Sequence, residues 1–226
     1  MAAGSAIVTT VRRGTRYTEA NRALAARTAK ELGIPNVLRG NDSIEELRKT
    51  YNVDAVLVAR QGLLTLVTTE GELFFHPGMA HLRMKNLLLG HGDHLVRALG
   101  LTEGMHVLDC TLGIGADAIV ESFAVGASGS VTALESNALI AAVIADGLAH
   151  AIGDNYDMHA AMRRIVVQHA DALTFLRAAA DKGYDVIYFD PMFRRPLHES
   201  AGMNALRVLA DMRALTEETI AEARRV

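Results

Sequence analysis

The chain has a single cysteine, Cys110, and no long apolar run. One cysteine cannot form an intrachain disulfide and is too few for a cysteine zinc site. The longest apolar run, Ala138 to Ala145, has eight residues, whereas a membrane-spanning helix needs about 20. The N-terminus also lacks the apolar segment of a signal peptide. These absences predict a soluble, cytoplasmic protein that does not bind a membrane.

A large excess of positive charge is also missing. The chain has 23 basic and 26 acidic residues and a net charge of −3, whereas many nucleic-acid-binding proteins carry a broad basic field. Any RNA or DNA would therefore have to be bound by local patches. Half of the 226 residues are hydrophobic, and the mean hydropathy is +0.16. This composition is typical of a globular chain with a sizeable core.

The first third of the chain mixes helical and strand patterns. Thr18–Leu32 is rich in helix formers and is followed by Gly33, and Ser43–Glu46 has the spacing of a capping box. These patterns predict two helices, of which the second extends to about Tyr51. Three apolar or β-branched runs then predict a three-stranded meander, with strands at Asp54–Arg60, Leu63–Thr69 and Glu72–His76.

From His106 onward, apolar strands alternate with alanine-rich helices, which predicts a parallel sheet wrapped by helices. The expected strands are His106–Cys110, Val131–Glu135, Ile165–His169 and Asp185–Asp190, and the expected helices are 115–125, 137–150, 172–180 and 204–213. Met79–Leu99 is a helical pattern interrupted by two glycines. We therefore expect a small α+β domain in residues 1–78, a connecting helix in 79–104 that packs on the second domain, and a Rossmann-like, doubly wound α/β catalytic domain in 105–226.

A glycine-rich turn follows the first of these strands. Glycines at 113 and 115 allow the backbone to approach a ligand closely, and the helix behind them offers free N–H donors. The pattern Gly-x-Gly-x-x-Ala also fits a dinucleotide-binding fingerprint, with Glu135 where a ribose-binding acid is expected. An NAD-dependent oxidoreductase is therefore one candidate.

Acidic residues at the strand ends favour a different cofactor. Asp109, Glu135, Asp171 and Asp190 follow four successive strands, so they should meet in the crevice where open α/β sheets bind ligands. Four carboxylates would repel a pyrophosphate. They suit S-adenosylmethionine, which carries an ammonium group, a sulfonium group and a ribose diol.

This set of residues resembles that of the class I S-adenosylmethionine-dependent methyltransferases. More narrowly, the chain resembles the bacterial family that methylates the exocyclic N2 of a guanine in 16S ribosomal RNA. The resemblance covers roughly residues 78–193. It rests on Met79-Ala80-His81 with Arg83, on the segment from Leu108 to Ala118, and on Tyr188-Phe189-Asp190-Pro191-Met192-Phe193.

The resemblance implies a cofactor site without a metal ion. The cofactor-binding residues would be Asp109, Thr111, Gly113, Gly115, Ala116, Asp117, Glu135, Ser136, Asp171, Ala172 and Asp190. Within this set, Glu135 and Ser136 would hold the ribose, and Asp171 and Ala172 would border the adenine. The family has small hydroxyl residues at these last two positions, so Asp171 is a departure that we expect to bind the adenine amine.

The resemblance also implies catalytic roles for Asp190, Pro191 and Phe193. The Asp190 carboxylate and the Pro191 carbonyl would accept the two hydrogens of the target amine, and Phe193 would stack on the base. Ribosomal RNA or the small ribosomal subunit would be the partner. The basic stretch that follows, Arg194, Arg195 and His198, is thinner than in the family.

Several alternatives stay open at this point. Asp171 could cap a helix as well as contact a cofactor. Arg83 and the basic residues Lys85, Arg12, Arg13 and Arg16 could track phosphates, although solvated surface charge is commoner. The chain could also be a non-catalytic RNA-binding or assembly protein on a methyltransferase scaffold. The oligomeric state is left open, with a homodimer as one option.

The number of strands is lower than the family's fold requires. That fold has seven strands in the order 3-2-1-4-5-7-6, whereas this sequence predicts four, and Arg224-Arg225-Val226 is expected to lead into a fifth. The strand before Asp190 would then be an exposed apolar edge, which is an aggregation liability. We expect further chain or a partner to cover it.

Overall fold

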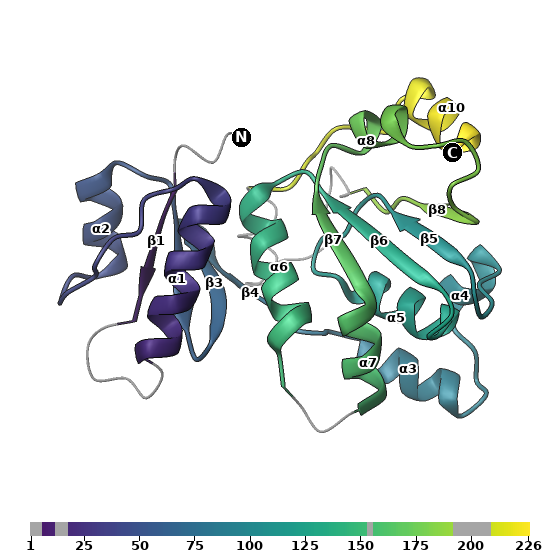
Figure 1. Ribbon diagram of the computed structural model, residues 1–226, viewed down its shortest axis with the longest axis horizontal. Helices are drawn as coiled ribbons and strands as arrows, with labels where there is room; N and C mark the ends of the chain where they lie inside the picture. Colours follow the sequence, from purple (N-terminus) through teal and green to yellow (C-terminus); the bar gives the residue numbers. More distant parts are fainter. Residues whose placement is uncertain (1–5, 12–17, 153–155, 192–208) are drawn as a thin grey trace. The chain divides into compact units, whose positions relative to one another are not determined.

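The computed structural model describes residues 6–11, 18–152, 156–191 and 209–226 (Figure 1). The contacts divide the chain into two compact units. The first holds strands β1–β4 with helices α1, α2 and α6, and the second holds the remaining strands and helices. No helix in these ranges is long and apolar enough to cross a membrane.

The sheet of the first unit has four strands in the order β1-β2-β3-β4, namely β1 (Ala6–Thr10), β2 (Ala55–Arg60), β3 (Leu63–Thr68) and β4 (Gly71–Phe74). The meander of β2, β3 and β4 is antiparallel, which confirms the predicted strands. Its first turn, Gln61-Gly62, has positive φ at both residues, as a tight hairpin turn requires. Strand β1 runs parallel to β2 and was not predicted.

The helices of the first unit cover both faces of this sheet. They are α1 (Thr18–Leu32), α2 (Ile44–Tyr51) and α6 (Ala138–His150). The predicted capping box starts α2, since Ser43 and Glu46 bond each other's backbone. Leu47 of α2 packs with Val56 and Val58 of β2, while α1 and α6 pack on β3. Gly147 lies so close to Phe75 that a Cβ there would come within 2.0 Å of the ring's Cγ, so α6 needs glycine at this point.

The sheet of the second unit is parallel throughout, as predicted. Its strands are β5 (His106–Asp109), β6 (Ser130–Glu135), β7 (Ile165–His169) and β8 (Val186–Tyr188), in the order β7-β6-β5-β8. The strand order reverses between β5 and β8. In open α/β sheets, ligands bind beyond the carboxyl ends of the strands at such a point.

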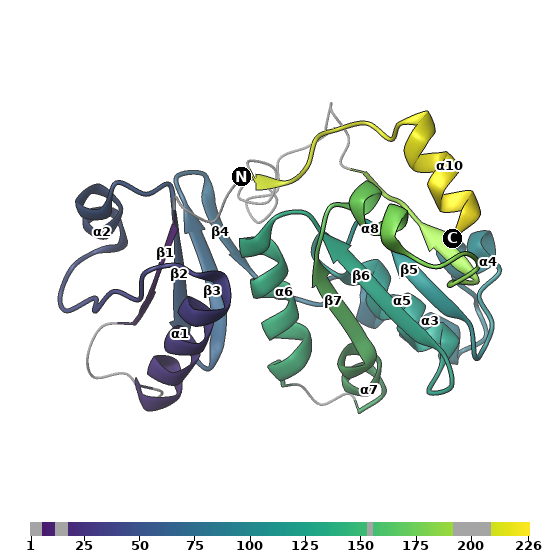
Figure 2. The same cartoon turned by 45° about the horizontal axis from the view of Figure 1, so that its top comes forward.

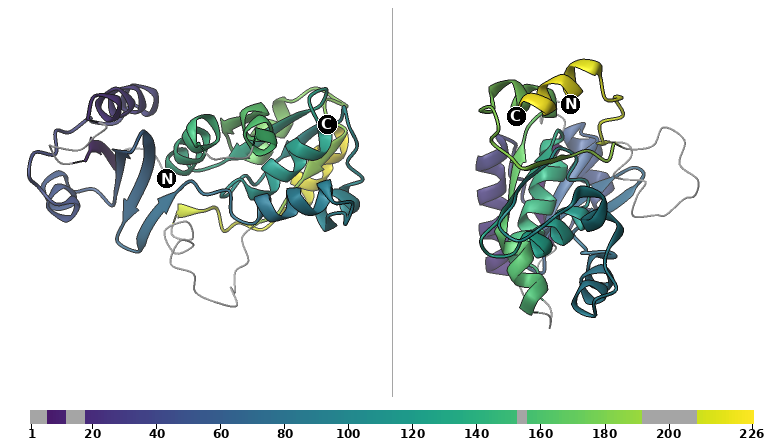
Figure 3. Two further views of the ribbon diagram at one scale, coloured as in Figure 1. Left: turned by 90° about the horizontal axis from the view of Figure 1, so that it is seen from below. Right: turned by 90° about the vertical axis from the view of Figure 1, so that its right-hand side faces the viewer.

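Helices cover both faces of the second sheet (Figure 3). They are α3 (Ala80–Leu88), α4 (His94–Leu99), α5 (Ala116–Val125), α7 (Tyr156–Arg164), α8 (Ala172–Ala178) and α10 (Glu217–Arg225). Helices α8 and α10 lie side by side (Figure 2) and pack with Leu108 and Leu134 on one face. Helix α5 lies on the other face, with α3, α4 and α7 packed against it. The region predicted as a connecting helix therefore consists of two short helices.

Three helix predictions need correction. Helices α7 and α10 were not predicted, and Arg224 and Arg225 belong to the last turn of α10 rather than to the start of a strand. Thr216 caps α10, and acidic residues in its first turn and basic residues in its last turn suit the helix dipole. Residues 204–208 of the predicted helix 204–213 lie outside the described residues, and residues 211–213 are not helical.

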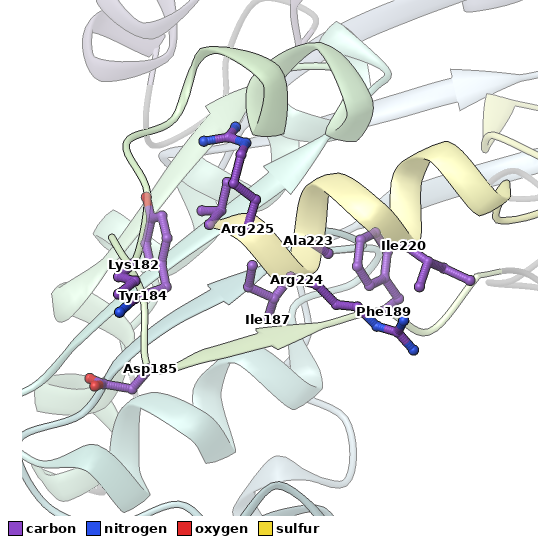
Figure 4. A pocket seen from close by; sticks show the side chains of 10 residues that line it. Lys182, Tyr184, Asp185, Ile187, Phe189, Ile220, Ala223, Arg224 and Arg225 are labelled. Carbon is purple, nitrogen blue, oxygen red and sulfur yellow. The ribbon is translucent and has the colours of Figure 1, made fainter.

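Strand β8 has one neighbour among the described strands, so it stands at the edge of the sheet as predicted. A pocket of about 430 Å³ lies between β8 and α10 (Figure 4). Ile187 and Phe189 form one wall, and Ile220 and Ala223 of α10 form the other. The lining therefore combines apolar residues with charged ones, namely Lys182, Asp185, Arg224 and Arg225.

Candidate functional site

The carboxyl ends of β5 and β8 are joined through one threonine. The Thr111 backbone N–H donates to Asp109 Oδ1 at 2.8 Å, and its hydroxyl oxygen accepts from the Asp190 backbone N–H at 2.7 Å. The Cys110 N–H donates to the Tyr188 carbonyl at 2.9 Å. Three of the predicted site residues are therefore held together at the point where the strand order reverses.

The glycine turn adopts a backbone that other residues rarely allow. Gly113 has a φ of 53° and Gly115 a φ of 80°, both in the left-handed region. Gly115 precedes α5 and has no side chain to cap it. The first N–H groups of α5, which begins with Ala116 and Asp117, therefore remain available to a ligand.

A predicted residue, Asp109, and an unpredicted one, Glu121, are the most deeply buried acids of this site. Asp109 is 1% exposed and Glu121 is 0% exposed, and no residue in the described ranges hydrogen-bonds either carboxylate oxygen of Glu121. Burial raises the pKa of both carboxyls, and the charge of Asp109 raises that of Glu121 further. The only hint of Glu121 in the sequence is an acid that directly follows the apolar run Ala118–Val120.

Arg83 joins helix α3 to the glycine turn. Its guanidinium donates two hydrogen bonds to Asp93, at 2.8 and 2.9 Å, and a third to Asp117. The other carboxylate oxygen of Asp117 accepts from the Tyr188 hydroxyl at 3.0 Å. The hydrogen bonds from Arg83 lower the pKa of Asp93 to about 2. Arg83 is thus neither solvated surface charge nor free for phosphate, which corrects both sequence-based interpretations.

Glu135 stands at the carboxyl end of β6 next to the glycine turn. Its Oε1 accepts from the Asn137 N–H at 2.8 Å and from the Ser136 hydroxyl at 3.5 Å. Burial raises the pKa of Glu135, while the N–H groups of Asn137 and Gly113 lower it. The structure therefore brings the predicted ribose acid to the predicted turn.

Asp171 caps helix α8. Its Oδ1 accepts from the Thr174 N–H at 2.9 Å, and its Oδ2 pairs with Arg213. The hydrogen bond from the Thr174 N–H is the main cause of its lowered pKa. The capping interpretation is thus confirmed, and Ala172 is the first residue of α8. Both oxygens of Asp171 already have protein partners, so its contact with an adenine amine stays a prediction.

Asp190 lies two residues beyond β8, and its side chain is exposed. No described residue is seen to donate a hydrogen bond to its carboxylate, whose pKa is raised by partial burial and by the charge of Asp117. Pro191 follows it. Phe193, Arg194, Arg195 and His198 lie outside the described residues, as do Arg12, Arg13 and Arg16.

The charges of this site suit a cationic ligand. Arg83 pairs with Asp93 and Asp117, whereas Asp109, Glu121 and Asp190 have no such partner among the described residues. The glycine turn adds N–H donors, and Glu135 offers an acceptor for hydroxyl groups. This donor set fits the ammonium, sulfonium and ribose diol of S-adenosylmethionine. Within the described ranges, no group of three or more His, Cys, Asp or Glu residues could hold a metal ion.

Comparison with known proteins gives relatives of two kinds. The chain is 39% identical to the uncharacterized protein YpiP of Bacillus subtilis over 202 residues, which are 89% of this chain and 79% of YpiP. It is also similar to proteins named ribosomal RNA small subunit methyltransferase J. Identity is 35% over 122 residues for Dechloromonas aromatica and 32% over 148 residues for Legionella pneumophila. These stretches cover 53% and 65% of this chain, and 47% and 58% of the respective relative. The chain thus spans about half the length of these methyltransferases.

A solved structure has the same fold. The SAM-dependent methyltransferase NGO1261 of Neisseria gonorrhoeae matches with a TM-score of 0.57 at 18% identity, over 82% of this chain and 69% of that protein. Residues 45–217 match the family described as "Putative SAM-dependent methyltransferase". This match favours the methyltransferase over the NAD-dependent oxidoreductase. The chain belongs to this family of S-adenosylmethionine-dependent methyltransferases.

Proposed function

We propose that this methyltransferase modifies an exocyclic amine of a nucleobase, namely guanine N2 in the RNA of the small ribosomal subunit. The observation that carries the proposal is the Asp190 carboxylate, which is exposed beyond β8. The Asp190 backbone N–H is held by the Thr111 hydroxyl, and the Thr111 N–H in turn bonds Asp109. An acceptor in this position suits a substrate that presents N–H groups. The names of the relatives from Dechloromonas and Legionella support an RNA substrate.

The cofactor would be held by residues of three strand ends. Asp109, Thr111 and the turn from Gly113 through Gly115 to Ala116 and Asp117 would face its methionine part. Glu135 and Ser136 would face the ribose, and Asp171 and Ala172 the adenine. When bound, S-adenosylmethionine supplies a methyl group on a positively charged sulfur. Glu135 is suited to the diol because it is fixed by the Asn137 N–H.

Asp190 would orient the target amine. Its carboxylate and the Pro191 carbonyl would each accept one hydrogen of that amine, which turns the nitrogen lone pair out of conjugation with the base. Orientation of this kind can supply about 7–11 kcal/mol of a reaction barrier. The raised pKa of Asp190 also suits a group that receives a proton as the amine becomes methylated.

Recognition of the base would involve Phe193 and a partly opened RNA. Stacking of a base on an aromatic ring contributes about 1–3 kcal/mol. A paired guanine would first have to leave its stack, at a cost of a few kcal/mol. The first unit would help to dock the RNA, a role that rests on analogy with other methyltransferases.

Transfer of a radiolabelled methyl group tests the proposal. Purified protein is incubated with labelled S-adenosylmethionine and either naked 16S ribosomal RNA or 30S particles that lack the modification. We expect label in RNA with the native protein and none with the Asp190→Ala variant. Unchanged methylation by the variant would contradict the proposed role of Asp190. Binding of the cofactor without transfer to any RNA, DNA or protein would favour a non-catalytic assembly protein.

A further inference from the structure

Glu121 is a buried acid that the proposed function leaves without a role. It lies on α5, is 0% exposed, and receives no hydrogen bond at either carboxylate oxygen from the part of the chain that the structure describes. An ionised carboxylate in that state would cost several kcal/mol. A buried polar group without a partner therefore calls for a functional explanation.

The fold places Glu121 on the same side of the sheet as Asp109. Leu108 and Cys110 pack with Leu176 of α8 on one face of β5. Because side chains alternate along a strand, Asp109 points to the other face, where α5 lies. Glu121 is four residues after Asp117 on α5, so these two also share one side of the helix.

The charges around Glu121 on balance oppose its ionisation. Asp109 of β5 and Asp117 of α5 act against its ionisation, and Arg83 of α3 acts in favour. Arg83 is already engaged with Asp93 and Asp117. Arg164, at the end of α7, donates to the carbonyl of the neighbouring Ser122 at 2.8 Å.

The ionisation of the Asp109 carboxyl is likewise favoured by some neighbours and opposed by others. Its Oδ1 accepts from Thr111, which favours ionisation. The charges of Asp117 and Asp190 oppose ionisation. Tyr188, at the end of β8, remains protonated because burial and Asp117 raise its pKa. The cluster thus holds two buried acids without a cation of their own.

We infer that Asp109 and Glu121 together hold a proton in the cofactor-free protein and release it to solvent when the positive charges of S-adenosylmethionine bind. Glu121 is then a positioning residue, since it acts on the cofactor through Asp109. The inference rests on the proposed cofactor site. A nearby cation favours the ionised form of a carboxyl, so the direction of the proton transfer follows from the charges.

Titration calorimetry with S-adenosylmethionine tests this directly. Binding is measured at pH 7.0 in phosphate and in Tris, which differ in their heat of ionisation, so the difference in binding heat counts the protons released. We expect about one proton per bound cofactor. Below about pH 7.5, the amine of the cofactor itself keeps its proton. In that range, the affinity for S-adenosylmethionine should increase by up to tenfold for each unit of increase in pH. Identical heats in both buffers would overturn the inference.

Two variants locate the proton. Glu121→Gln should release at most half of the native count and flatten the pH dependence of the dissociation constant. Asp146→Asn is the matched control, because Asp146 is also a buried acid with a raised pKa but lies in the first unit. It should release the native count. A native count in Glu121→Gln would contradict the inference.

The outcomes separate this inference from the proposed function. Should Glu121→Gln fail to fold, the two-buffer comparison on the native protein still decides whether a proton leaves. Cofactor binding without proton release removes the inference and leaves RNA methylation untouched. Absence of cofactor binding would overturn both.

Discussion

The two units treat a buried acid in opposite ways. In the first unit, Asp146 of α6 accepts from the Leu64 N–H at 2.9 Å, and Arg27 and His150 lie within 3.4 Å of its other oxygen. In the second unit, the carboxylate of Glu121 has no hydrogen-bond partner among the described residues. A buried acid with hydrogen-bond partners stabilises the fold. A buried acid without such partners calls for a functional explanation, such as the binding of a ligand.

The same contrast divides the acids within the second unit. Asp93 and Asp171 cap helices and pair with arginines. Asp109 and Asp190 lie at strand ends without a cationic partner among the described residues. The comparison predicts that substitution of Asp93 affects mainly stability, and that substitution of Asp109 or Asp190 affects mainly ligand binding or turnover.

The largest effect is expected at Asp190. Asp190→Ala should lower the rate of methyl transfer by roughly 100- to 1,000-fold, the usual loss for one catalytic hydrogen-bonding group. Its free energy of unfolding should stay within about 0.5 kcal/mol of the native value, as for an exposed position. Single-turnover rates and urea unfolding measure the two quantities. Asp185→Asn, at the other end of β8, is the control and should keep its turnover.

Asp146 should show the opposite pattern. Asp146→Ala removes the acceptor of a buried backbone N–H and the carboxylate that Arg27 and His150 contact, so the free energy of unfolding should fall by about 2–3 kcal/mol. The dissociation constant for S-adenosylmethionine should not change. Glu31→Ala, which removes an exposed partner of Arg27, serves as the control. A variant that loses cofactor affinity as strongly as stability would break the comparison between the units.

Arg83→Met tests a residue that both stabilises the fold and contacts a residue of the proposed cofactor site. Arg83→Met would leave Asp93 and Asp117 without their cation, so we expect a loss of about 1–2 kcal/mol in stability and a shift of roughly tenfold in cofactor affinity. Arg97→Met is the control, since Arg97 lies on α4 and its side chain bonds the nearby His94 in an exposed contact. Equal effects of the two substitutions would show that the Arg83 network does not position Asp117.

The pH dependence of stability tests the same contrast at Glu121. Burial raises the folded-state pKa of Glu121 above its unfolded value, so the folded protein binds this proton more tightly. Stability therefore falls as pH rises from about 4 through the raised pKa. Glu121→Gln removes that part of the loss. Relative to the native protein, it should gain more than about 1.4 kcal/mol, the equivalent of one pKa unit, between pH 5 and pH 9 in urea unfolding. No gain would mean that Glu121 is ionised throughout.

Local patterns predicted most of the fold. The capping box of α2, the meander turns and the alternation after His106 each depend on neighbouring residues, and the structure has all three. Strand β1 was missed because its partner β2 lies about 50 residues away along the chain. Helices α7 and α10 are short and rich in charged residues, so their apolar faces are too narrow to give a clear pattern.

The site was predictable only where a motif marks it. Asp109, Thr111, the glycines, Glu135 and Asp190 sit at strand ends and meet as the topology requires. Arg83 could not be placed, because its partner Asp117 is 34 residues away and the pairing depends on how α3 packs on α5. Glu121 could not be found either, since its burial arises from several helices packed around α5.

Nucleoside analysis of the methylated RNA tests the central claim most directly. The small-subunit RNA is labelled by the native protein, digested to nucleosides and separated by chromatography with mass spectrometry. Our account predicts that the label is found in N2-methylguanosine and disappears with Asp190→Ala. Label in another nucleoside, or no label from a protein that binds S-adenosylmethionine, would contradict it.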